Sequence, residues 1–560
     1  MTSYGTLQRV HAPEAGWALR PVPHVALRVK RIFPRIRTTS GGADGPALTI
    51  KDTPEVAHEL LWVMDRWPFL ASVDDLAYLR ERASAYEQTR SDVEAILAGY
   101  VPPDTWRDTA LPPRDYQLAA CSIVHRTGRL LLTDELGLGK TVSALLVLRD
   151  PEALPAVVVC PVHLQTQWER ECERFLPWLT PHVARRGQPY DISGADVLIL
   201  SYHKLDGWQP HLTAEARTVI FDEAQELRRN TSQKYQAAQA VARSARYRVG
   251  LTATPVYNYG DEIHSVISVL DADVLGSRDE FLREWCGGWG SGGGAKVSDP
   301  KALGTYLRDE GVMLGRSRSD VGRELPPAVA VEHVVDIDSE RLADEAEGAE
   351  VLARQIMDAQ GTPQELWRAS GDLDWRLRHA TGVAKAKHVA AFVSMLLETG
   401  EAVVLFGWHR SVYDIWMEKL RAHDPVLYTG SETAARKDVN ARRFLDGETN
   451  LLVMSLRSGA GLDGLQERSK VAVFGELDWS PGVHAQCVGR LRRDGQQDTV
   501  VAYYLVAEEG SDPVVSEVLD LKSQQQVLLM DEDAALLRPA PDTGDRVKRL
   551  AADFLARRHP

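Results

Sequence analysis

The stretch that decides the fold is LLLTDELGLGKT, residues 130–141. An apolar strand pattern runs into a glycine-containing turn, and a helical pattern follows it. A turn at a helix N-terminus directs unpaired backbone N–H groups at an anion. Gly137 and Gly139 would let the backbone approach a phosphate closely. Lys140 would neutralise phosphate charge and Thr141 would offer its hydroxyl to Mg²⁺, so the pattern predicts a nucleotide-binding loop.

A pair of acidic residues follows the apolar strand pattern Thr218–Phe221. Asp222 and Glu223 stand at the carboxyl end of this strand, where ligands bind in parallel sheets. We expect Asp222 to hold Mg²⁺ through water, and Glu223 to orient and deprotonate an attacking water. Alone, such a pair would indicate solvated surface charge, but beside a phosphate loop it favours hydrolysis of the bound nucleotide.

Cationic residues occur far downstream in QCVGRLRRDGQ, residues 486–496. In a helix, Arg490 and Arg493 would share one face because they are three residues apart. A surface cluster is the common meaning of such arginines, yet a phosphoryl group in transfer needs cationic donors. We therefore expect Gln486, Arg490 and Arg493 to act with Lys140 from a separate folding unit, with the nucleotide in a cleft between two lobes.

Strand and helix patterns alternate through two parts of the chain, which predicts parallel sheets covered by helices on both faces. Apolar runs occur at Leu130–Thr133, Ala156–Cys160, Asp196–Leu200, Thr218–Phe221 and Tyr247–Thr252, and again at Ala402–Phe406, Val426–Tyr428, Asn450–Ser455, Lys470–Phe474 and Thr499–Val506. We predict an α/β protein with an accessory module (1–105), a first lobe (106–325) with a helical and glycine-rich insertion (256–325), a linker with a short helical insertion (326–380), a second lobe (381–530) and a tail helix (531–560).

Residues 1–105 read as an α+β module. The segment HVALRVKRIFPRIR, His24–Arg37, alternates apolar and basic residues and predicts a strand, whereas Pro54–Trp67 and Val73–Ala98 predict helices. Residues 1–40 hold seven Lys or Arg against one acid, on a chain of net charge −14. This basic stretch is a candidate for sequence-independent DNA contact, and the whole module is a candidate surface for a protein partner. The alternative for residues 24–37 is a strand whose basic residues simply face solvent and contact no DNA.

Composition excludes several classes of protein. The 560 residues are 44% hydrophobic and 26% charged, typical of folded domains. We find no run near the ~18 apolar residues of a membrane span and no secretory signal in the first thirty residues. The five cysteines are scattered without a CxxC pair, so we expect neither structural zinc nor disulfides. We expect a cytoplasmic protein, associated with the nucleoid if bacterial or in the host cytoplasm if phage-encoded.

Taken in chain order, these motifs resemble the Swi/Snf-type ATPases of the second helicase superfamily. The resemblance spans roughly residues 108–530 and is carried by PRDYQ (113–117), DELGLGKT (134–141), VVCPVHL (158–164) with QWE (167–169), LSY (200–202), DEAQ (222–225), LTATP (251–255), the segments 403–408 and 458–465, DWSP (478–481) and the arginine segment. So many motifs in one order make the resemblance specific. A further similarity, to the annealing-helicase branch, is carried by FLREWC (281–286), MLGR (313–316) and ELPP (324–327).

The resemblance implies two RecA-like lobes, ATP and Mg²⁺ as cofactors, and translocation along double-stranded or branched DNA without strand separation. It implies that Gln117 contacts adenine. Strand-end hydroxyls and backbone groups can hold DNA phosphates without reading sequence. The candidate DNA contacts are Ser201, Tyr202, Thr252, Thr254, Trp168 and Lys437. The alternatives are an ATPase associated with RNA or RNA polymerase, and a nucleotide-gated nucleic-acid-binding switch with little hydrolysis.

Overall fold

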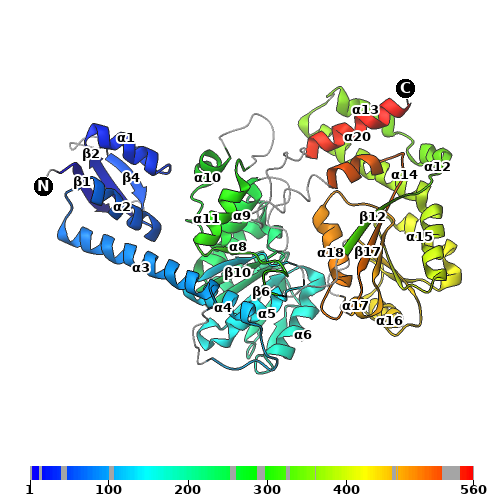
Figure 1. The fold of residues 1–560 in the computed structure, drawn as a ribbon, viewed down its shortest axis with the longest axis horizontal. Coiled ribbons are helices and arrows are strands. Elements are labelled where there is room, and N and C mark those ends of the chain that lie inside the picture. Colours follow the sequence, from blue (N-terminus) through cyan, green and yellow to red (C-terminus); the bar gives the residue numbers. More distant parts are fainter. Residues whose placement is uncertain are drawn as a thin grey trace.

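The computed structural model describes residues 3–11, 15–39, 47–99, 106–135, 137–252, 260–286, 297–322, 328–359, 361–456, 462, 464–519 and 543–558. An N-terminal module, a first lobe and a second lobe follow one another along the chain (Figure 1). Within these described ranges, no helix is both long and apolar enough to cross a membrane.

The N-terminal module is a four-stranded antiparallel sheet with helices packed on it. Its strands are β1 (Gly5–Val10), β2 (Gly16–Pro21), β3 (Arg37–Thr39) and β4 (Ala47–Lys51), in the order β1-β2-β4-β3. The helices are α1 (Pro23–Ile32) and α2 (Pro54–Arg66), and the long α3 (Val73–Leu97) leads from the module to the first lobe (Figure 1).

The strand predicted for His24–Arg37 is wrong over most of its length, because α1 occupies it. Pro23 stands in the first turn of this helix, where its fixed φ and missing N–H cost nothing. Val25 and Val29, four residues apart, are fully buried in the module's core. Apolar residues that recur every second position also recur every fourth, so the pattern allowed both structures and the sheet beneath selected the helix.

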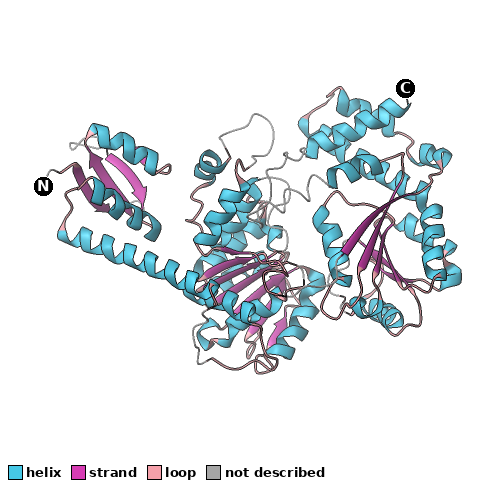
Figure 2. Ribbon diagram, viewed as in Figure 1, coloured by secondary structure: helices cyan, strands magenta, loops and turns pink. Residues whose placement is uncertain are grey.

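Lobe 1 is built on a parallel sheet of order β11-β5-β10-β9-β6-β8-β7. Its strands are β5 (Arg129–Leu132), β6 (Ala156–Cys160), β7 (Pro181–Val183), β8 (Val197–Ser201), β9 (Thr218–Asp222), β10 (Tyr247–Leu251) and β11 (Met313–Leu314). Its helices are α4 (Asp115–Thr127), α5 (Lys140–Leu145), α6 (Gln165–Phe175), α7 (Leu205–Glu215), α8 (Gln233–Ser244), α9 (Gly260–Leu270), α10 (Arg278–Trp285) and α11 (Pro300–Asp309). Figure 2 shows helices on both faces of this sheet.

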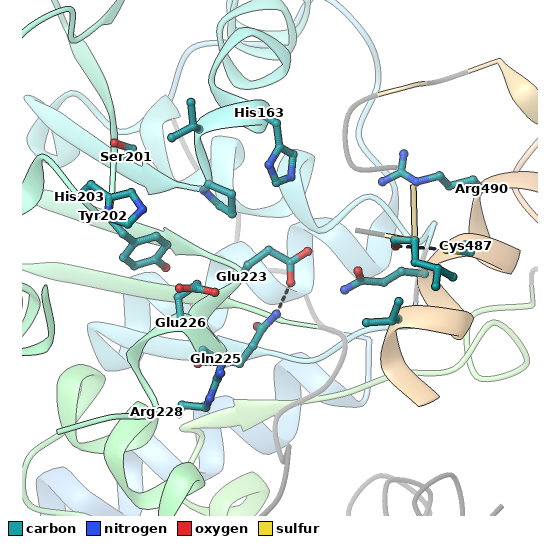
Figure 3. A pocket seen from close by; sticks show the side chains of 15 residues that line it. His163, Ser201, Tyr202, His203, Glu223, Gln225, Glu226, Arg228, Cys487 and Arg490 are labelled. Atoms are coloured by element: carbon teal, nitrogen blue, oxygen red, sulfur yellow. Dashed lines mark hydrogen bonds between the residues drawn. The ribbon is translucent and has the colours of Figure 1, made fainter. Parts of the chain in front are cut away.

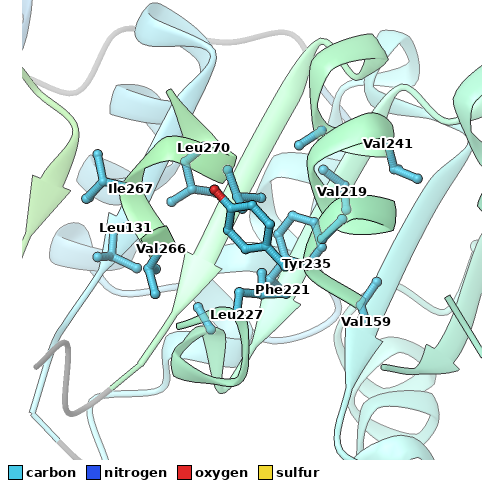
Figure 4. Close-up of a cluster of buried hydrophobic side chains, with 14 of the residues drawn as sticks. Leu131, Val159, Val219, Phe221, Leu227, Tyr235, Val241, Val266, Ile267 and Leu270 are labelled. Carbon is cyan, nitrogen blue, oxygen red and sulfur yellow. The ribbon is translucent and has the colours of Figure 1, made fainter. Parts of the chain in front are cut away.

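Alternate residues along the central strands of lobe 1 point to opposite faces. Val159 and Phe221 belong to the core on one face, together with Tyr235 and Ile267 of the covering helices (Figure 4). Their neighbours, including Ile220, belong to the core on the other face. Both faces are therefore apolar, as a doubly covered parallel sheet requires.

Lobe 2 repeats this architecture with the strand order β12-β17-β16-β13-β15-β14, all parallel. Its strands are β12 (Ala328–Val334), β13 (Val403–Gly407), β14 (Val426–Tyr428), β15 (Leu451–Ser455), β16 (Val471–Phe474) and β17 (Val500–Val506). Its helices are α12 (Ser339–Glu345), α13 (Ala349–Met357), α14 (Pro363–Glu398), α15 (Arg410–Lys419), α16 (Ala434–Leu445), α17 (Leu465–Arg468), α18 (Pro481–Leu491) and α20 (Thr543–Arg558). The prediction of two parallel-sheet α/β lobes is confirmed.

The segment 326–380 between the lobes, predicted as an extended strand followed by helix, contains strand β12 and then helices in its described residues. Strand β12 pairs along its whole length with β17, so residues 328–334 form an edge of the second sheet. Helix α14 then runs from Pro363 to Glu398 without interruption. The tail helix α20 packs against α13 and α14 through Leu550 and Ala551, which are buried. The glycine-rich stretch 287–294 lies outside the described residues.

Candidate active site

The phosphate loop runs from the end of β5 to the start of α5. Gly137 and Gly139 have φ angles of +87° and +76°, in the left-handed region that favours glycine. A Cβ at residue 137 would lie 2.1 Å from Arg318 Nη2, and one at residue 139 would lie 2.7 Å from Gln117 Nε2. Conformation and space therefore both require glycine at these two positions, because Arg318 and Gln117 pack directly against them.

Lys140 lies among charged groups of both lobes. Its Nζ donates a hydrogen bond to the backbone oxygen of Asp134 at 2.5 Å. Burial lowers the pKa of Lys140, while the carboxylates of Asp134, Glu223 and Asp222 oppose that shift. The charge of Arg493, from lobe 2, adds to the lowering. The charge of the Lys140 ammonium group therefore interacts with the acidic pair and with an arginine of the opposite lobe. Burial disfavours the charged form of Lys140, and a bound phosphate would offset that cost.

The acidic pair is held rigidly at the end of β9. Asp222 Oδ2 accepts a hydrogen bond from the Trp168 indole at 2.7 Å, and Oδ1 accepts one from the Glu223 backbone N–H at 2.9 Å. Burial, followed by the charge of Glu223, raises the pKa of Asp222 to about 7. Glu223 has a φ of +52°, a strained value for a non-glycine residue, and Gln225 donates to its carboxylate. The strand end therefore places Glu223 in the lining of the cavity and holds Asp222 beside it by hydrogen bonds within lobe 1.

Gln117 holds the start of α4 against the phosphate loop. Its Oε1 accepts from the backbone N–H of Arg114 at 3.0 Å, and its Nε2 donates to the oxygen of Leu138 at 3.2 Å. The Tyr116 hydroxyl donates to the same oxygen at 2.9 Å. The structure thus places the predicted adenine contact directly beside the loop, with its amide bonded to protein.

Sequence reasoning missed the residue that anchors the loop, Arg316. Its guanidinium donates to both carboxylate oxygens of Asp134, from Nε at 3.0 Å and from Nη2 at 2.6 Å. Asp134 is fully buried, and a third guanidinium nitrogen of Arg316 reaches the Tyr116 backbone oxygen at 2.5 Å. Asp134 is therefore the buried partner of an arginine and not a phosphate contact. An arginine just after the short apolar strand β11 was the available signal.

Lobe 2 faces this arrangement across a cavity of about 450 Å³. Lobe 1 lines the cavity with His163, Tyr202 and Glu223, and lobe 2 lines it with Gln486 and Arg490, among other residues. Figure 3 shows Glu223 and His163 on one side and Arg490 on the other. The structure therefore brings the catalytic candidates of α18 opposite the acid at the end of β9.

Two of the predicted DNA contacts lie inside lobe 1. Trp168 is 2% exposed and its indole is bonded to Asp222, so it positions an active-site acid and has no surface to offer DNA. Thr252 is also 2% exposed, and its backbone N–H donates to the oxygen of Leu132 at 3.1 Å. A tryptophan in a polar helix reads as an exposed contact in sequence, and only the folded chain places its indole under Asp222. Thr254 lies outside the described residues.

The other candidate contacts lie at the cleft. Ser201 and Tyr202 line the cavity, although the Tyr202 hydroxyl donates to the backbone oxygen of Asp222 at 2.8 Å. Lys437 lies on α16 of lobe 2, yet its charge is felt by His163 of lobe 1. Desolvation in the cleft lowers the pKa of His163 to about 4, and the charges of Arg490 and Lys437 add to that shift. The charge of Lys437 therefore acts on lobe 1, while its Nζ lies 5.4 Å from the centre of the Tyr428 ring in lobe 2.

The residues present fit ATP with Mg²⁺. The loop from Gly137 to Lys140 leads into the N-terminus of α5, where backbone N–H groups and the Lys140 ammonium suit a phosphate. Thr141 stands in the first turn of α5, and Asp222 carries an excess of local negative charge that a divalent cation would relieve. Among the described residues, no group of three or more His, Cys, Asp or Glu side chains could hold a metal ion. Magnesium in nucleotide sites is commonly bound by one or two carboxylates together with phosphate oxygens of the substrate.

Comparisons with known proteins agree with this arrangement. A family model described as SNF2-related domain matches residues 85–344. The chain is 26% identical over 419 residues to the SWI/SNF-related matrix-associated actin-dependent regulator of chromatin subfamily A-like protein 1 of Xenopus tropicalis, covering 72% of this chain and 43% of that protein. It is 26% identical over 433 residues to the DNA annealing helicase and endonuclease ZRANB3 of Mus musculus, covering 72% and 39%. The chain thus spans less than half the length of these relatives.

Among solved structures, the chain is similar to the Sulfolobus solfataricus SWI2/SNF2 ATPase core in complex with dsDNA. The TM-score is 0.39 at 18% identity, covering 78% of this chain and 100% of that chain.

Proposed function

This chain carries an SNF2-related domain and is related to the Swi/Snf-type proteins, and from that premise we propose that it is an ATP-dependent double-stranded DNA translocase that remodels DNA or protein–DNA complexes. The proposal covers ATP hydrolysis with Mg²⁺, stimulated by DNA and without obligatory strand separation.

One observation carries the proposal: Lys140 of lobe 1 and Arg493 of lobe 2 interact electrostatically at the same place as the acidic pair. Cationic groups from both lobes beside the acidic pair suit a ligand that is negatively charged and that binds Mg²⁺. A triphosphate in that position would contact both lobes at once. Binding and hydrolysis would then change how the lobes close, which is the physical basis of movement along DNA.

Each site residue has a distinct part in this reaction. The loop backbone and Lys140 hold the phosphates, and Thr141 and Asp222 hold Mg²⁺, which neutralises phosphate charge when bound. Glu223, fixed by its hydrogen bond from Gln225, orients the attacking water and takes its proton. Gln486, Arg490 and Arg493 stabilise the charge that develops on the transferred phosphoryl group.

Double-stranded or branched DNA is the proposed partner because the relatives include a DNA annealing helicase. Of the remaining candidates, Lys437 is partly exposed and suited to a DNA backbone phosphate, whereas Ser201 and Tyr202 line the cavity but are 2% and 4% exposed. The module 1–105 offers a second contact, since Arg28, Lys30 and Arg31 are exposed on α1. The same module is the proposed surface for a protein partner.

The test is steady-state phosphate release measured with duplex DNA, single-stranded DNA, RNA and no nucleic acid, followed by triplex displacement for movement. We expect duplex DNA to stimulate most. We expect Lys140→Ala to abolish turnover, and Glu223→Gln to bind ATP normally without hydrolysing it. Normal turnover by either variant contradicts the assignment. Preferential stimulation by RNA would favour an RNA-associated ATPase, and ATP-dependent DNA binding with negligible turnover would favour a switch.

A further inference from the structure

Arg492 and Asp494 flank Arg493 and make hydrogen bonds and ion pairs with lobe 1. Asp494 Oδ2 lies 3.2 Å from Arg114 Nη2, and its Oδ1 lies 3.9 Å from Arg318 Nη1. Arg318 Nη2 also donates a hydrogen bond to the backbone oxygen of Arg492 at 3.2 Å. Contacts between the lobes therefore hold the chain immediately before and immediately after Arg493.

Arg318 is itself fixed inside lobe 1. It is 3% exposed, and its guanidinium lies against Gly137, where a Cβ would approach Nη2 to 2.1 Å. Its backbone N–H donates to Glu135 Oε2 at 2.8 Å, and its Nε lies 3.5 Å from Glu135 Oε1. A buried guanidinium held by the phosphate loop is a rigid element, unlike an ion pair between flexible surface side chains.

Arg493 needs such support because α18 ends at Leu491. Beyond that residue the helix no longer fixes the backbone, and Arg492 has non-helical torsions of φ −91° and ψ 72°. The Arg493 side chain folds back on α18, with Nε donating to the Gly489 oxygen at 3.1 Å. Where its guanidinium stands relative to lobe 1 therefore depends on this bond within lobe 2 and on the lobe contacts of its two neighbours.

We infer that Asp494 and Arg318 are positioning residues that set the location of Arg493 over the phosphate site when the lobes meet. The inference rests on the proposed function, since Arg493 is the group being positioned for phosphoryl transfer. A misplacement of about 1 Å can cost about 100-fold in rate, so a residue that never touches the nucleotide can control turnover. Asp494 follows Arg493 directly in the chain. A change in the distance between Asp494 and lobe 1 would therefore move the backbone of Arg493 as well.

The first test is ATP turnover by Asp494→Asn at saturating duplex DNA. We expect kcat to fall about tenfold while KM for ATP changes less than about twofold, because the contact acts on the transition state. The decisive measurement is a double-mutant cycle. In an Arg493→Ala background, Asp494→Asn should cause no further loss, because its effect passes through Arg493. If Asp494→Asn lowers kcat by the same factor with and without Arg493→Ala, Asp494 has a general structural role and the inference is overturned.

Two further variants sharpen this test. Asp424→Asn is the matched control, because Asp424 is exposed and pairs with Arg443 inside lobe 2, so the same substitution removes a charge pair that does not cross the cleft. It should leave kcat unchanged. Arg318→Lys keeps the charge but cannot reach Asp494 and Arg492 together, so we expect a loss close to that of Asp494→Asn. Full activity of Arg318→Lys would contradict the role given to its forked guanidinium.

A second measurement is independent of activity. Spin labels at Ser244→Cys in lobe 1 and Glu418→Cys in lobe 2, both exposed positions, report the distance between the lobes in a Cys286→Ser background. Without nucleotide, Asp494→Asn should lengthen and broaden this distance, and Asp424→Asn should not. An unchanged distribution overturns the inference. If the wild-type protein proves unable to hydrolyse ATP, the proposed function fails, and the label distances still decide whether Asp494 holds the lobes together.

Discussion

The two lobes share one architecture but hold their functional groups in different ways. In lobe 1, Asp222 is supported by Trp168 and Asp134 by Arg316, and all four residues belong to that lobe. In lobe 2, the arginine segment beyond α18 is held from within by Gln496 and also by contacts of Asp494 with the opposite lobe. The half of the site in lobe 1 is therefore supported from within its own lobe, whereas the half in lobe 2 takes part of its support from across the cleft.

Lobe 2 does contain a rigid buried network, but it lies elsewhere. The Glu476 carboxylate accepts hydrogen bonds from the backbone N–H groups of Trp408 and His409 at 2.6 and 3.0 Å, and from His409 Nδ1 at 2.6 Å. Burial acts to raise the pKa of Glu476, but the bonds and charge of His409 hold it below its usual range. This network fixes the end of β13, whereas the arginine segment is supported within lobe 2 by Gln496, whose Nε2 donates to the backbone oxygens of Gln466, Ser469 and Leu491.

Among the variants that test this difference between the lobes, we expect the largest loss of kcat when an arginine of lobe 2 is removed. Arg493→Ala should lower kcat by about 10³-fold or more, with a much smaller change in KM, because the charge that it meets develops during transfer. Steady-state kinetics at saturating duplex DNA measure this. Arg442→Ala, an exposed arginine on α16, is the control and should behave as wild type. A variant that only weakens ATP binding would show that Arg493 is not poised over the phosphate.

The next effect tests internal support in lobe 1. Arg316→Met leaves Asp134 buried without its counter-charge, so we expect a loss of about 3–5 kcal/mol in the free energy of unfolding. Urea titration measures it, and ATP affinity should fall as well because the loop is released. Adding Asp134→Asn should restore part of the stability, since the uncompensated charge is then gone. Equal instability of the single and double variants would argue against the ion pair as the cause.

Trp168→Phe should have a moderate effect on turnover. It removes the indole donor that holds down the pKa of Asp222, which burial has already raised to about 7. The pKa should rise further, so kcat near pH 7 should fall by about tenfold and the acid limb of the pH–rate profile should move to higher pH. Trp178→Phe removes an indole bonded to the Asp108 backbone oxygen and should leave the profile unchanged. An unshifted acid limb in Trp168→Phe would show that the indole does not tune Asp222.

The smallest effect concerns stability. The folded-state pKa of Asp222, about 7, lies above its usual value of about 3.9. The folded state therefore binds this proton more tightly, and the resulting stability is complete below pH about 4 and is lost as the pH rises through about 7. Without nucleotide, Asp222→Asn should melt a few degrees above wild type at pH 8, and the difference should shrink at pH 5.

Calorimetry at the two pH values checks this last expectation. Asp438→Asn, an exposed substitution on α16, should show no such pH-dependent difference. A lower melting temperature for Asp222→Asn at pH 8 would mean that the ionised carboxylate stabilises the fold, contrary to its burial beside Glu223.

The sequence by itself located the interior strands of both sheets to within one residue, since a strand covered on both faces must be a continuous apolar run. It missed the short strands β7 and β11, because two or three residues carry no period. It also placed the phosphate loop and the acidic pair at strand ends, because each of these features is local and needs only its neighbours in the chain.

Only the tertiary structure decided which charged group meets which. Trp168 and Asp222 are 54 residues apart in sequence, and Asp134 and Arg316 are 182 apart, yet both pairs are in hydrogen-bond contact. The helix at Pro23–Ile32 was likewise chosen by the sheet that buries Val25 and Val29. Hydrogen bonds and ion pairs depend on separations of about 3 Å, and those separations are set by the packing of whole elements and not by local spacing.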